Sequence, residues 1–105
     1  MARIDGESLH APHLIDLEVL SVLRRQVLAG DLSAERAAAG ITALTQLDLV
    51  RYQHATFADR IWALRENLTP YDAAYVALAE ALNVPLLTLD GRLARSSRQV
   101  HVELF

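Results

Sequence analysis

Cysteine and lysine are both absent from the 105 residues of this chain. Without cysteine, the protein has neither a disulfide nor a thiolate metal site. No apolar run approaches the roughly 20 residues that span a bilayer, so no membrane association is expected. The first ten residues, MARIDGESLH, lack the apolar centre of a signal peptide. Together these absences predict a cytoplasmic protein.

Because lysine is absent, all ten basic residues are arginine. Arginine suits two-point contact with a phosphate or a carboxylate. A genome rich in G and C would produce the same bias, and that explanation is the simpler one. An isoelectric point near 5.7 argues against a protein that coats nucleic acid. It does not exclude an acidic metal site that acts on phosphodiesters, with arginines around it.

The apolar content is ample for one folded domain over residues 1–105. Hydrophobic residues make up 52% of the chain, and the formal net charge is only -3. A disordered chain would have less apolar material and more net charge. The length is that of a single domain.

Helical and strand patterns alternate along the sequence. Helices are predicted over about residues 13–29, 33–47, 56–66 and 69–82. Short apolar or alternating segments predict strands over residues 8–11, 49–53, 85–89 and 100–104. This alternation indicates an α/β fold in which a mostly parallel sheet is flanked by helices.

Capping residues mark the ends of the predicted helices. Pro12 is expected in the first turn of the first helix, where its missing N–H costs nothing. The expected N-caps are Ser33, Thr56 and Thr69, and the expected helix ends are Gly30 and Asn83.

Two aspartates occupy places where chemistry and local structure offer competing explanations. Asp90 directly follows the apolar strand predicted at residues 85–89, and ligands of open α/β sheets bind beyond the carboxyl ends of strands. A turn aspartate before Gly91 is the structural alternative. Asp72 is the third helical residue after Thr69, where an acid can close a capping box. It shares a helix face with Tyr75, which makes an inward, functional side chain equally reasonable.

Glu18 is the third acid of interest. It lies in LIDLEVLSVLRR, on a helix face that is otherwise largely apolar. Burying a lone carboxylate is costly unless it is paired or binds a metal. A salt bridge to Arg25 is the alternative, although a spacing of seven residues is long for one. Asp16 is expected to face solvent.

A divalent cation would explain the three acids together. Magnesium and manganese prefer oxygen ligands, and carboxylates that converge on one edge repel each other unless a cation lies between them. Such a site can lower the pKa of a bound water and neutralise charge on a phosphodiester. No spacing in the sequence proves that the three acids converge.

The chain resembles the PIN-domain family, and more closely the VapC toxins of bacterial type II toxin–antitoxin systems. The matching motifs are APHLIDLEVLSVLRR, LTPYDAAYVALAEAL and PLLTLDGRLAR, and the likeness runs from about residue 8 to the end. It implies a PIN-like three-layer sandwich and a magnesium- or manganese-dependent endoribonuclease that acts on RNA. It also implies silencing by a VapB-type antitoxin, and a homodimer within a larger toxin–antitoxin complex.

The resemblance assigns roles to four residues. The second, third and fourth acids of the family fall on Glu18, Asp72 and Asp90, as catalytic residues and metal ligands. Thr88 lies where the family often has a hydroxyl near the site. Apart from the resemblance, Arg92 begins an arginine run (Arg92, Arg95, Arg98) after Asp90. A solvated face is the default explanation of the run, and contact with a substrate phosphate is the functional alternative because the run begins beside the expected site.

The sequence departs from the family at its start. Members begin with an apolar strand that ends in an aspartate, and this chain shows no such strand. Asp5 follows no apolar run and is not assigned that role. The strands at residues 8–11 and 85–89 are then expected to keep unpaired edges. A mis-assigned start, a decayed remnant, or a strand supplied by another chain would each account for the difference.

Other polar and aromatic residues are assigned to structure. A metal site at His10, His13, His54 and His101 is not expected, because Pro12 separates the first pair. Trp62 is predicted to be a core or interface residue rather than a base-stacking platform. Tyr71 and Tyr75 flank Asp72 and could line the site or a dimer interface, but core packing is their expected role.

Two further functions remain alternatives to the nuclease. A catalytically impaired PIN remnant could bind only an antitoxin or another partner protein. A small structural domain could use its acids as helix caps alone.

Overall fold

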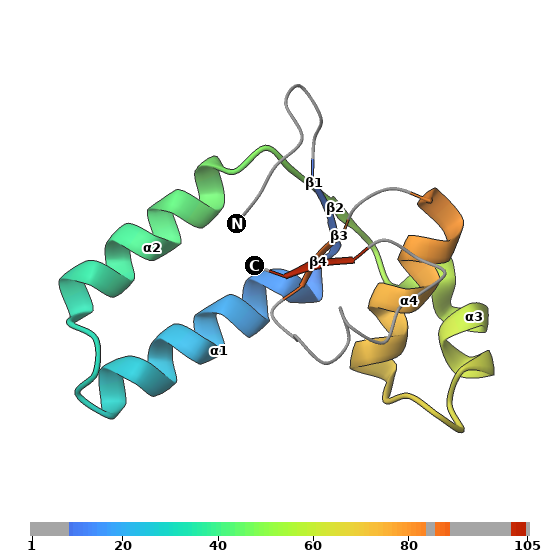
Figure 1. Ribbon diagram of the computed structural model, residues 1–105, viewed down its shortest axis with the longest axis horizontal. Helices are drawn as coiled ribbons and strands as arrows, with labels where there is room; N and C mark the ends of the chain where they lie inside the picture. The colour runs from blue at the N-terminus through green and yellow to red at the C-terminus, as the bar shows by residue number, and fades with distance from the viewer. Residues whose placement is uncertain (1–8, 84–85, 89–101, 105) are drawn as a thin grey trace.

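The computed structural model describes residues 9–83, 86–88 and 102–104, which form an α/β fold (Figure 1). Its strands are β1 (Leu9–Pro12), β2 (Leu49–Tyr52), β3 (Leu86–Thr88) and β4 (Val102–Leu104). Its helices are α1 (Leu14–Leu28), α2 (Ala34–Gln46), α3 (Ala58–Ala63) and α4 (Pro70–Leu82), and a 3-10 turn, η1 (Ala55–Phe57), precedes α3. The predicted fold class is confirmed.

The four strands form one parallel sheet in the order β2-β1-β3-β4. Leu9 lies opposite Leu49 at one end of the sheet, and Leu86 lies opposite Val102 at the other. Parallel neighbours need long crossover connections. The α1–α2 pair connects β1 to β2, and η1, α3 and α4 connect β2 to β3. The alternating segment β2 is an edge strand among the four described strands.

The expectation of unpaired edges on β1 and β3 is wrong. His10 of β1 lies opposite Leu86 of β3, and the two strands pair directly and in parallel. Direct pairing satisfies backbone groups that two open edges would leave without partners. The expectation that no strand precedes β1, and the assignment of Asp5, concern residues outside the described part of the chain.

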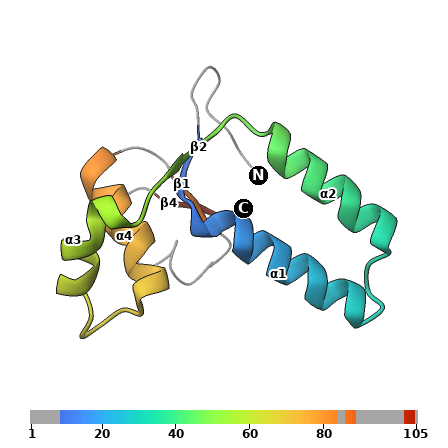
Figure 2. The same cartoon turned by 180° about the vertical axis from the view of Figure 1, so that it is seen from behind.

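Helices cover both faces of the sheet. Figures 1 and 2 show α1 and α2 on one side of the strands and α3 and α4 on the other. Ile15 and Val19 of α1 and Tyr75 of α4 belong to one buried cluster. Leu78 of α4 and Leu86 of β3 belong to a second. Helix α4 therefore contributes to both clusters and holds the two halves of the core together.

Most of the predicted helix ends are confirmed. The Ser33 hydroxyl accepts the Arg36 N–H at 3.1 Å, and the Thr69 hydroxyl accepts the Asp72 N–H at 3.2 Å. Gly30 follows α1 with φ 82°, and Asn83 ends α4 with φ 52°. Both residue types tolerate this left-handed conformation, which stops a helix and turns the chain.

Two predicted helix starts differ from the structure. Thr56 lies inside η1, and no described side chain caps α3, which ends at Ala63 rather than near residue 66. Pro12 is the last residue of β1, opposite Tyr52, and lies outside α1. The His13 N–H donates to the Tyr52 carbonyl at 2.9 Å, so pairing with β2 holds this segment extended up to the start of the helix.

Replacing Thr69 with alanine is expected to lower the free energy of unfolding by about 1 kcal/mol, because the first turn of α4 loses its side-chain acceptor. Urea denaturation followed by circular dichroism measures this. Thr56→Ala is the matched control and should change stability by less than about 0.5 kcal/mol. Equal losses in the two variants would contradict the assigned caps.

Candidate active site

Glu18 lies on the inner face of α1, in the second turn after β1. Its neighbours Ile15 and Val19 are buried, and Glu18 itself is half-buried. The Tyr75 hydroxyl of α4 donates a hydrogen bond to the Oε1 atom of Glu18. A half-buried carboxylate on an apolar face is therefore stabilised by a donor from another helix.

Asp72 is the third residue of α4 and is also half-buried. It precedes Tyr75 by three residues, so the two side chains lie on the same face of the helix. Thr69 caps the backbone of Asp72, which fixes the first turn of α4. Asp72 thus projects from an ordered helix start.

The charges of Glu18 and Asp72 both act on the Tyr75 phenol. Burial raises the pKa of Tyr75 well above its ordinary value, and the hydrogen bond to Glu18 raises it further. The charges of Glu18, Asp16 and Asp72 act in the same direction. The carboxylates of Glu18 and Asp72, 54 positions apart in the sequence, therefore act on one hydroxyl that remains protonated and able to donate.

The topology places this cluster at the carboxyl edge of the sheet. Helix α1 starts where β1 ends, which is at the carboxyl edge of the sheet. Helix α4 leads back to the start of β3 at the amino edge, so the N-terminus of α4, which carries Asp72, lies at the carboxyl edge. That edge carries the ligand sites of open parallel sheets. Thr88 is the last residue of β3. The Thr88 side chain, Asp90 and Arg92 lie outside the described part of the chain.

The donor chemistry at this edge fits a hard divalent cation. Glu18 and Asp72 supply carboxylate oxygens, which magnesium and manganese prefer. Within residues 9–83 and the described strand residues, no group of three or more potential ligands forms a complete metal site. Two described acids are thus consistent with part of an oxygen donor set, and the predicted third lies outside that region.

The expectation that Asp16 faces solvent is wrong. It accepts hydrogen bonds from the Nε and Nη2 atoms of Arg51, at 2.7 and 2.9 Å, and both side chains are partly buried. The same guanidinium donates to the Leu44 carbonyl at 3.4 Å. This two-point contact joins α1, the helix that carries Glu18, to β2 and to the end of α2.

The alternative role for Glu18, a salt bridge to Arg25, does not occur. Ion pairs between described side chains join Arg51 to Asp16 and Arg60 to Glu80. In each pair the two residues are far apart in the sequence, so local spacing does not reveal either ion pair.

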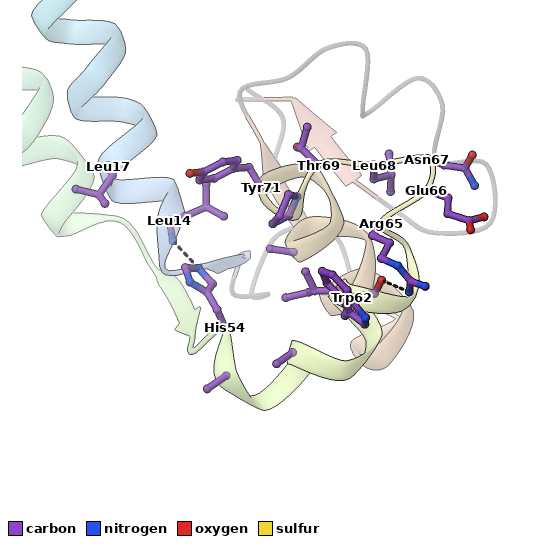
Figure 3. Close-up of a pocket in the computed structure, with 15 residues that line it drawn as sticks. Leu14, Leu17, His54, Trp62, Arg65, Glu66, Asn67, Leu68, Thr69 and Tyr71 are labelled. Atoms are coloured by element: carbon purple, nitrogen blue, oxygen red, sulfur yellow. Dashed lines mark hydrogen bonds between the residues drawn. The ribbon is translucent and has the colours of Figure 1, made fainter.

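A groove of about 890 Å³ lies between α1, α3 and the start of α4. Figure 3 shows Leu14 and Leu17 of α1, Tyr71 of α4, and Trp62 around it. The expected core position of Tyr71 is wrong, because 68% of it is exposed, whereas Tyr75 is buried as expected. Trp62 is 67% exposed and therefore is not a core residue, and the Arg65 guanidinium lies 4.8 Å from its ring centre.

The described histidines have structural roles. His10 lies in β1 and contacts the Tyr52 hydroxyl at 2.8 Å, and His13 directly precedes α1, so the two do not share a helix. The Nε2 atom of His54 accepts the N–H of Leu14 at 3.2 Å (Figure 3). His54 thereby satisfies a backbone donor at the start of α1, a role that no local sequence signal indicated.

A family model of the PIN domain matches residues 1–98. The chain belongs to the PIN-domain family. It is 54% identical to Ribonuclease VapC1 of Mycobacterium tuberculosis over 86 residues, 81% of this chain and 65% of that protein. It is 45% identical to Ribonuclease VapC9 of the same species over 91 residues, 87% of this chain and 72% of the relative.

A third relative, Ribonuclease VapC12 of M. tuberculosis, is 40% identical over 94 residues, 90% of this chain and 73% of the relative. The chain therefore spans about two thirds of the length of VapC1 and somewhat more of the other two. The resemblance drawn from the three motifs is confirmed. None of the described helices has the length and apolar character needed to cross a membrane.

Proposed function

We propose that this PIN-family protein is a divalent-metal-dependent endoribonuclease toxin of the VapC type, which hydrolyses RNA phosphodiesters. The observation that carries the proposal is the pair of half-buried acids, Glu18 and Asp72, whose charges act on one hydroxyl at the carboxyl edge of a parallel sheet. The names of the relatives support it, since each is a ribonuclease.

In this proposal Glu18, Asp72 and Asp90 hold a magnesium or manganese ion. When bound, such an ion lowers the pKa of a water and neutralises charge on the scissile phosphate. Helices α1 and α4 orient the first two carboxylates, because both side chains project from helix starts that are held by hydrogen bonds. Thr88 and Arg92 are the proposed contacts to the RNA phosphate. No side-chain nucleophile is required.

The proposed partners are a VapB-type antitoxin and a second copy of the chain, within a larger toxin–antitoxin complex. Exposed apolar side chains support protein partners. Leu17 is 71% exposed and Leu28 69%, both on α1, and Ile41 of the adjacent α2 is exposed as well. Apolar surface of this kind commonly marks an interaction site.

The nuclease proposal predicts that the purified chain cleaves a pool of tRNA and rRNA in the presence of manganese. Cleavage should stop on chelation with EDTA and return when magnesium or manganese is added in excess, since the carboxylates need a cation to act on a phosphodiester. Gel electrophoresis of end-labelled RNA measures the rate. Cleavage that continues in EDTA would contradict metal dependence. A protein that binds an antitoxin yet cuts no RNA with any divalent cation would favour the impaired remnant.

A further inference from the structure

We propose that Tyr75 is a positioning residue, which holds the Glu18 carboxylate in the orientation that metal binding requires. The inference rests on the proposed function, because it assigns Glu18 to a metal site. It adds a residue that the acidic motifs leave out, and it gives α4 two tasks at that site.

The Tyr75 ring is fixed by its surroundings. The residue is 2% exposed and belongs to the buried cluster that includes Ile15, Val19 and Ala74. A tyrosine packed in this way has little freedom in its ring torsions. Its hydroxyl is therefore a donor at a defined point in space.

The Tyr75 hydroxyl donates its hydrogen bond to Glu18. A phenylalanine would fill nearly the same volume, so packing alone does not require the oxygen atom. A buried hydroxyl needs a hydrogen-bond partner, and the partner here is the Oε1 atom of Glu18. The bond spans 57 positions of sequence and joins α4 to α1. It restricts a glutamate side chain that would otherwise lose rotamer freedom on binding a cation.

Tyr75 is the donor in its contact with Glu18. A phenol has an ordinary pKa of about 10 and therefore keeps its proton at neutral pH. A carboxylate has about four lone-pair positions, and one hydroxyl uses a single position. The hydrogen bond from Tyr75 thus orients Glu18 through one of these positions. Partners that orient metal ligands in this way commonly change metal affinity by about 10- to 100-fold.

Asp72 and Tyr75 make the arrangement specific to α4. They lie three residues apart on one face, so the same rigid helix presents one proposed ligand and positions the other. The relative placement of the two carboxylates is then fixed by α4 and by its contact with α1.

The test is Tyr75→Phe, which removes only the hydroxyl. Manganese binding, followed by the electron paramagnetic resonance signal of the free ion, is expected to weaken about 10- to 100-fold. Tyr71→Phe is the matched control, because Tyr71 lies on the same helix and is largely exposed. It should bind manganese as the wild type does. Equal dissociation constants for Tyr75→Phe and the wild type would overturn the inference.

A double-mutant cycle separates positioning from a general effect on the fold. If Tyr75 acts through Glu18, Tyr75→Phe should have no further effect on manganese affinity in a Glu18→Ala background, which removes the acceptor of the Tyr75 hydroxyl. An undiminished effect in that background would mean that the hydroxyl acts on the fold rather than on Glu18, and would overturn the inference.

A second measurement does not depend on the folding of the Tyr75 variant. The chain has three tyrosines, so Tyr52→Phe combined with Tyr71→Phe leaves Tyr75 alone. Its ultraviolet difference spectrum should change with manganese and saturate with the ion that binds. An unchanged spectrum during saturable binding would overturn the positioning role. Absence of manganese binding by the wild type would instead defeat the proposed function.

Discussion

Asp72→Asn and Glu18→Gln are each expected to lower manganese-dependent RNA cleavage by more than about 100-fold. Each change removes one negative charge and one ligand oxygen from the proposed site while keeping the shape of the side chain. Partners that only orient a ligand already change metal-site function by about 10- to 100-fold, so loss of a ligand should cost more. Initial rates on end-labelled RNA at saturating manganese measure the effect.

The fold should survive these substitutions. In Asp72→Asn, the backbone N–H of residue 72 still donates to Thr69, so the cap of α4 remains. In Glu18→Gln, the amide oxygen can still accept the Tyr75 hydroxyl. Asp59→Asn is the matched control: Asp59 is an exposed acid in the first turn of α3 and is not one of the proposed metal ligands. It should retain the wild-type cleavage rate.

The same variants separate the three functional hypotheses. A nuclease loses cleavage and still binds its antitoxin. A protein that only binds a partner has no cleavage to lose, and its binding is indifferent to these substitutions. If the acids are helix caps alone, the changes cost at most about 1 kcal/mol of stability and manganese does not raise the melting temperature. Wild-type cleavage by both variants would contradict the proposed site.

Local signals predicted the elements of this fold well. The caps at Ser33 and Thr69 and the helix ends at Gly30 and Asn83 depend on a few neighbouring residues, so the chain reveals them directly. The predicted cap at Thr56 is wrong because Thr56 lies within a 3-10 turn that forms before α3 begins. The parallel sheet followed from the alternation of helices and short strands.

Contacts between segments that are distant in the sequence were not predicted from it. The motifs identified Glu18 and Asp72, but the hydroxyl that joins α4 to Glu18 comes from a tyrosine expected only to fill the core. Its spacing of three from Asp72 was the available signal. The Asp16–Arg51 pair had none, because 35 positions separate the two residues. Direct pairing of β1 with β3 was likewise missed, since register across a sheet is decided by the assembled core.

Leu78→Ala is expected to lower the free energy of unfolding by about 2–5 kcal/mol, the largest stability loss predicted for this chain. Leu78 is 1% exposed and packs with Ala79 and Leu86 in the cluster that joins α4 to β3. Truncation removes buried apolar surface and leaves a cavity between helix and sheet. Domains of this size are stable by about 5–15 kcal/mol, so a large share of the stability depends on this one side chain.

Urea denaturation measures the loss, with Leu17→Ala as the matched control. Leu17 undergoes the same chemical change on α1 but is 71% exposed, so its truncation should alter stability by less than about 0.5 kcal/mol. The denaturant slope should stay constant in both variants, because the surface exposed on unfolding hardly changes. Similar losses in the two variants would contradict the packing of α4 on β3. Leu78→Ala should also lower cleavage as the temperature approaches its reduced melting point, because less of the protein is then folded.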